Sequence, residues 1–106
     1  MASLAATPAS GSITATKDFV KINVTGGLSN SGSFDPAAYP TTPAVRYYLT
    51  FELASAIQGK SYVFGVDNAG AHEFDNYVFP QAGSWTVRLS NAATDASVAT
   101  LSLTVA

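Results

Sequence analysis

The residues best suited to chemistry lie in one short stretch, residues 67–76. His72 is the one histidine of the chain, and it stands beside Glu73 and close to Asp67 and Asp75. A histidine oriented by carboxylates can act as a general base toward a serine nucleophile. However, the sequence has no nucleophile-elbow motif, and its many serines make proximity to a histidine common by chance. We therefore expect no catalytic residue and no enzymatic activity.

The same stretch carries oxygen atoms that could bind calcium. They belong to Asp67, Asn68, Glu73, Asp75 and Asn76, but their spacing matches no dedicated calcium loop. A solvated turn with local Asx hydrogen bonds explains the same residues, and calorimetric titration with calcium separates the two interpretations. The chain has no cysteine, which excludes disulfides and thiolate metal sites. The sequence thus predicts no cofactor and assigns no metal ligand.

Aromatic residues raise a third chemical possibility, a platform for carbohydrate. Tyr47, Tyr48 and Trp85 are the candidates. In a strand, neighbouring side chains point to opposite faces, so Tyr47 and Tyr48 do not form one surface. Tyr48, which we expect on the outer face, stays a candidate contact by itself.

The elements that must position these residues are β-strands. In residues 45–53, large apolar side chains alternate strictly with polar ones. The same two-residue period indicates further strands, and no segment has a helical period. We expect an all-β fold, an antiparallel sandwich of about seven strands. Beyond 45–53, the strands are expected in residues 13–16, 19–25, 61–67, 76–80, 84–90 and 97–106, with a turn at 54–60 and a loop at 67–75.

Two segments outside these strands are the expected regions of partner contact. Residues 1–12 are small and polar and predict a flexible N-terminal arm, either a leader or a docking strap, before a domain of residues 13–106. Residues 26–44 are rich in glycine and proline and predict a long loop, whose aromatics either contact partners or pack on the sandwich. The candidate contact residues are Leu4, Pro8, Ile13, Phe34, Tyr39 and Tyr48.

Composition narrows the classes of partner. With 106 residues, 47% of them hydrophobic, the chain can close the core of one domain. Only 11% of its residues are charged and the net charge is -2, so no basic surface for nucleic acid is expected. No run is long enough to span a membrane. The low charge fits either a surface covered in an assembly or a Ser/Thr-rich surface that water solvates.

The segment FPQAGSWTVRL, residues 79–89, resembles the end of bacterial and phage immunoglobulin-like domains, including the polycystic-kidney-disease type. In such domains an aromatic residue and a proline precede a glycine and an aromatic-x-Val-x-Leu strand. The resemblance implies that Pro80 ends one strand, that Gly83 permits a corner and that Trp85 anchors the core. A tyrosine is usual at this corner, and Trp85 cannot make the same hydroxyl hydrogen bond.

The resemblance also implies a role, by analogy between folds. A cysteine-free domain of this type that starts at Met1 without a signal peptide is similar to virion components of tailed phages, which are made in the host cytoplasm. The expected function is a capsid decoration protein that binds the major capsid protein. An adhesion module that binds host-surface glycans through loops 26–44 and 67–76 is the first alternative. A tail-tube-associated domain is the second alternative. The sequence does not decide whether the chain forms homo-oligomers.

Overall fold

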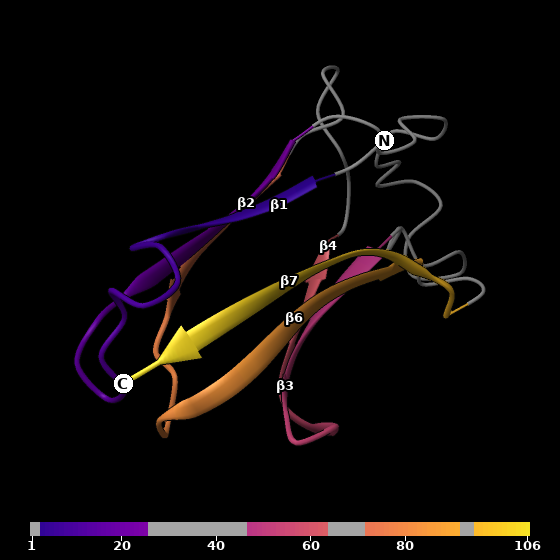
Figure 1. The fold of residues 1–106 in the computed structure, drawn as a ribbon. Helices are drawn as coiled ribbons and strands as arrows, with labels where there is room; N and C mark the ends of the chain where they lie inside the picture. Colours follow the sequence, from indigo (N-terminus) through magenta and orange to yellow (C-terminus); the bar gives the residue numbers. More distant parts are fainter. Residues whose placement is uncertain (1–2, 26–46, 64–71, 92–94) are drawn as a thin grey trace.

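The computed structural model describes residues 3–25, 47–63, 72–91 and 95–106. These residues form seven β-strands and no helix. The strands make two antiparallel sheets, one of three strands in the order β1-β2-β5 and one of four strands in the order β4-β3-β6-β7 (Figure 1). Their bounds are β1 Ser3–Thr7, β2 Val20–Thr25, β3 Tyr47–Leu53, β4 Ala56–Val63, β5 His72–Tyr77, β6 Gly83–Asn91 and β7 Ser97–Val105.

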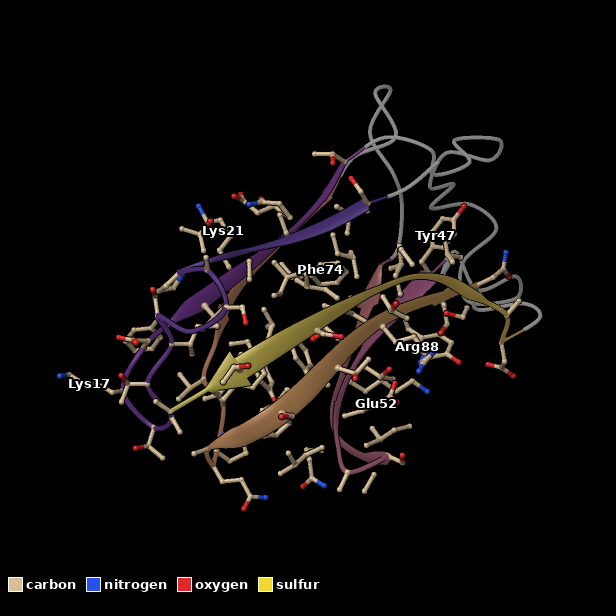
Figure 2. All side chains as sticks on the ribbon, viewed as in Figure 1. Lys17, Lys21, Tyr47, Glu52, Phe74 and Arg88 are labelled. Carbon is tan, nitrogen blue, oxygen red and sulfur yellow. The ribbon has the colours of Figure 1, made fainter. Side chains whose placement is uncertain are left out.

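Alternation of apolar and polar residues produces this arrangement, as the sequence predicts. In β2 every second residue is buried, and in β3 the side chains of Tyr47, Leu49 and Phe51 are buried on one face. Because successive side chains of a strand point to opposite faces, each sheet gains one apolar face, and the two apolar faces enclose the core. Figure 2 shows Phe74 of β5 in the space between the sheets. The expected all-β fold of two antiparallel sheets with seven strands is confirmed.

Several predicted boundaries are wrong. The turn expected at residues 54–60 is reduced to Ala54 and Ser55, whose φ angles of 51° and 67° suit a tight two-residue hairpin, so that β4 begins at Ala56. The loop expected up to residue 75 is a strand from His72 onward, because β5 pairs with β2. The strand expected around residues 13–16 is a single parallel bridge between Ile13 and Val105.

The expected flexible arm at residues 1–12 is also corrected. Ser3–Thr7 is strand β1, which pairs with β2 over five registered residues, from Ser3 opposite Thr25 to Thr7 opposite Lys21. Half-buried Leu4 and Ala6 pack against the core, so the strand gains apolar burial as well as main-chain hydrogen bonds. The segment is small and polar in composition, but an alternating half-apolar pattern is enough to add it to a sheet edge.

A cluster of aromatic rings occupies one end of the core. Phe51 and Tyr77 stack with ring centroids 3.5 Å apart, and Phe79 meets Tyr77 and Trp85 edge-on at 4.8 and 4.9 Å. Offset and edge-to-face pairs are favourable beyond the area they bury. These rings come from β3, β5, β6 and the corner between β5 and β6, so they join both sheets.

Trp85 anchors the corner that precedes β6. Its indole Nε1 donates a hydrogen bond of 2.9 Å to the carbonyl oxygen of Gln81, four residues upstream, while its ring is 1% exposed. The indole N–H is the hydrogen-bond donor at this corner. The corner of residues 78–83 is therefore fixed to the start of β6 by a buried ring and a directed hydrogen bond.

Candidate functional site

The outer face of the four-stranded sheet is the most organised polar surface of the described residues. We define it as the residues of β3, β4, β6 and β7 that point away from the core. Strand register places them in three rows across the sheet. The rows are Tyr48-Ser90-Ser97, Lys60-Thr50-Arg88-Thr100 and Ile57-Glu52-Thr86-Ser102, and within them Thr50 and Ser90 are each only 2% exposed. This face carries hydroxyl, carboxylate and cationic groups side by side.

Tyr48 is held from two sides. Its hydroxyl donates a hydrogen bond of 2.8 Å to Oδ1 of Asp95, in the turn between β6 and β7. The ammonium group of Lys60 lies 4.3 Å from the centre of the Tyr48 ring, in a cation–π contact. The hydrogen bond to Asp95 raises the pKa of Tyr48 above its ordinary value of 10.0. One face of the ring is thus in use, and that face is not free to stack on a sugar.

Glu52 is the centre of a second cluster on the same face. Its Oε2 accepts hydrogen bonds of 2.9 Å from Arg88 Nε and from Thr50 Oγ1. Arg88 also donates from Nη1 to Ser97 Oγ at 3.2 Å, which links β3, β6 and β7. Figure 2 shows Glu52 and Arg88 next to each other, on the side of the sheet away from the core. The cluster holds four side chains in fixed positions.

The Arg88 hydrogen bond lowers the pKa of Glu52 below its ordinary value of 4.5, with a further contribution from Thr50, although burial opposes the shift. A lowered folded-state pKa means that the bond stabilises the fold above the unfolded value. We expect Glu52→Gln to lower the free energy of unfolding by about 1–3 kcal/mol at pH 7. The deficit should shrink as the pH falls from 4.5 through the lowered pKa of Glu52, where the carboxylate itself becomes protonated.

Urea denaturation of wild type and Glu52→Gln at several pH values between 7 and about 2.5 measures this difference. Glu73→Gln is the matched control, because Glu73 forms an ion pair of the same length with Lys21, at 2.9 Å. Both of those side chains are nearly half exposed, so their pair contributes little. A deficit for Glu52→Gln that does not change with pH would contradict the assignment.

The structure places the predicted contact residues in different environments. Ile13 is 1% exposed and belongs to the core, so it is wrong as a contact residue. Leu4 and Pro8 are half-buried, in β1 and directly after it. Tyr48 is half-buried on the outer face, as expected from the alternation. Phe34 and Tyr39 lie outside the described residues.

The described part of the structure does not bring the candidate catalytic and metal-binding residues together. Asp67 and Asn68 lie outside the described residues, and of His72 only its place at the start of β5 is described. Glu73 points to the surface and pairs with Lys21. Within residues 3–25, 47–63, 72–91 and 95–106, no three side chains of the metal-binding types gather. The same residues contain no helix of the length and hydropathy that a membrane span needs.

Sequence reasoning missed the partners of Tyr48 and the whole Glu52 cluster. Arg88 and Glu52 stand on adjacent strands, 36 residues apart in the chain, and their contact depends on the register of β3 with β6. One signal was available, because both residues occupy the polar phase of a strongly alternating strand. The register itself could not be read from either strand by itself.

Comparison with known proteins adds no relative: no family model, no curated protein and no solved structure matches this chain significantly.

Proposed function

We propose that this chain is an immunoglobulin-like sandwich that acts as a non-enzymatic structural subunit of a virion, a capsid decoration protein that binds the major capsid protein. Strand order supports the fold assignment. The sheets β1-β2-β5 and β4-β3-β6-β7 have the two-sheet antiparallel plan of such domains, except that β4 pairs with β3 rather than with β5. The Trp85 bond at the corner before β6 is a second similarity. The resemblance of residues 79–89 and the low charge support the virion class.

The observation that carries the docking proposal is the prearranged outer face of the four-stranded sheet. Tyr48, Glu52 and Arg88 are already fixed by hydrogen bonds within the chain. Side chains that are ordered before binding lose little conformational entropy on binding, which favours affinity. An outer sheet face with paired charges suits a protein surface better than a small molecule, which needs a concave pocket. Because β1 is part of a sheet, this face replaces the N-terminal arm as the docking element.

Capsid cosedimentation tests the proposal. The probe is a capsid assembled from the major capsid protein of the same genome, incubated with purified chain and pelleted. We expect Arg88→Ala to weaken retention at least about tenfold, since interface arginines are frequent hot spots. Lys21→Ala is the matched control, because it also removes the cation of a 2.9 Å ion pair but lies on the other sheet.

Three results would count against it. Wild-type chain that does not pellet with capsids contradicts the decoration role. Equal losses for the two alanine variants contradict the choice of face, once thermal melts show both variants folded. Rings or filaments formed by the chain without capsids would favour the tail-tube-associated alternative, and specific signals on a glycan array would favour the adhesion alternative.

A further inference from the structure

The edge of β7 is paired along only half of its length by the described residues. β7 is the last strand of its sheet, and residues 10–15 run beside its C-terminal half. There, Thr104 accepts from Gly11 N at 3.0 Å and its own N–H donates to Ser10 Oγ at 2.8 Å. Ala106 in turn donates to Ile13 O at 2.9 Å and accepts from Ala15 N at 2.8 Å. Both residues therefore direct their main-chain groups away from β6.

Because main-chain groups in a strand repeat their direction every two residues, the N–H and C=O groups in the other half of β7 can be placed in the same way. Thr100 and Ser102 have the same phase as Thr104, so their N–H and C=O groups point to the same edge. No strand of the described residues pairs with them there. Their edge is therefore a row of hydrogen-bonding groups in position to pair with another strand.

The exposure of the inward-pointing side chains of β7 changes where the pairing with residues 10–15 ends. Leu103 and Val105, beside residues 10–15, are 3% and 2% exposed. Leu101 has the same inward phase but is only half-buried, where that pairing has ended. An added strand at this position would shield the rest of the Leu101 side chain, as residues 10–15 shield its neighbours.

The chemistry of β7 permits pairing with itself. Ser97–Val105 contains no charged residue, no glycine and no proline, so two copies side by side meet no like-charge repulsion. The opposite edge of the sheet, formed by β4, is by contrast protected against pairing. β4 carries Lys60 and a bulge opposite Phe51 and Glu52, and both features discourage edge pairing.

We propose that residues 98–102 of β7 pair antiparallel with the same residues of a second copy, around a twofold axis at Thr100. This is the register in which the paired stretch stays clear of residues 10–15 in both copies. Thr100 then exchanges two main-chain hydrogen bonds with Thr100 of the second copy, and Leu101 lies opposite Ala99. The two four-stranded sheets become one continuous sheet across an isologous interface. This inference does not depend on the capsid proposal.

Cross-linking tests the register directly, because the chain has no cysteine of its own. In a hydrogen-bonded antiparallel pair the two Cα atoms are about 5.5 Å apart, which is within the range of a disulfide. We expect Thr100→Cys to give a disulfide-linked dimer under mild oxidation. Ser84→Cys, on the same face but in the interior strand β6, should remain largely monomeric.

Sedimentation velocity from about 10 µM to about 1 mM tests the association without a covalent bond. Wild type should sediment faster as concentration rises. Thr100→Pro removes only the N–H that points to the open edge, and we expect it to weaken dimerisation at least about tenfold. Thr100→Val keeps that N–H and should dimerise like wild type.

If Thr100→Pro does not fold, Thr100→Lys replaces it, since two lysines facing each other across the axis repel. Ser84→Lys adds the same charge to the same face and should leave dimerisation intact. A wild type that is monomeric throughout this range would overturn the proposal. Equal behaviour of Thr100→Lys and Ser84→Lys, or equal cross-linking of the two cysteine variants, would also overturn it.

Discussion

Trp85→Ala is expected to lower the free energy of unfolding by about 3–5 kcal/mol, a large part of the stability of a domain of this size. The ring is 1% exposed and contacts Phe79 at 4.9 Å, so its removal leaves a cavity that a rigid two-sheet core cannot close. The substitution also leaves the carbonyl of Gln81 without its 2.9 Å donor. The corner before β6 and the end of the core should loosen together.

Chemical denaturation followed by far-ultraviolet circular dichroism measures the loss. Phe19→Ala is the matched control, because Phe19 is also a large aromatic residue but is 69% exposed, and its removal should change stability by less than about 0.5 kcal/mol. Trp85→Phe, which keeps most of the ring volume but not the N–H donor, should fall between the two. Similar stabilities for Trp85→Ala and Phe19→Ala would refute the role assigned to this corner.

Ile13→Ala is expected to cost about 2–5 kcal/mol. Ile13 is 1% exposed, and it follows a segment that the sequence predicts as a free arm. A contact residue on a flexible arm could be truncated without effect on folding, whereas a core residue could not. The size of the loss therefore separates the two descriptions of the N-terminal segment.

Thermal and urea unfolding of Ile13→Ala and Thr14→Ala provide the comparison. Thr14 is the next residue, its side chain is exposed, and its described bonds use the main chain, so Thr14→Ala should be close to wild type. A melting temperature for Ile13→Ala equal to that of Thr14→Ala would show that the N-terminal segment does not contribute to the core in solution.

Strands with strong alternation were predictable from the sequence, and strands with weak alternation were not. Residues 45–53 give the period plainly, and β3 lies within them at Tyr47–Leu53. The stretch Ala56–Val63 contains glycine, glutamine and lysine, and its pairing with β3 is fixed by the tight turn at Ala54 and Ser55. Ser3–Thr7 has small residues apart from Leu4, so its strand depends on an available edge of β2. Tertiary context decided both elements.

The candidate site was less predictable than the fold. Alternation placed Tyr48 on the outer face, and its half-buried position there agrees. Its hydrogen bond to Asp95, its cation–π contact with Lys60 and the ion pair between Glu52 and Arg88 depend on which strands are neighbours and on their register. Periodicity gives the face of a residue but not its cross-strand neighbour. The predicted contact residue Ile13 failed for a related reason, because a bridge to Val105 brings it into the core.

The parallel placement of residues 10–15 beside β7 has a mechanical consequence. Gly11, Ile13 and Ala15 are hydrogen-bonded to Thr104 and Ala106, close to the C-terminal end of the chain. In a parallel pair, tension applied to the segment from its N-terminal side and to β7 from its C-terminal side acts along the strands. Such a load shears these bonds together instead of opening them one after another. The chain should resist stretching between its ends with a higher rupture force than a hairpin that unzips from one end.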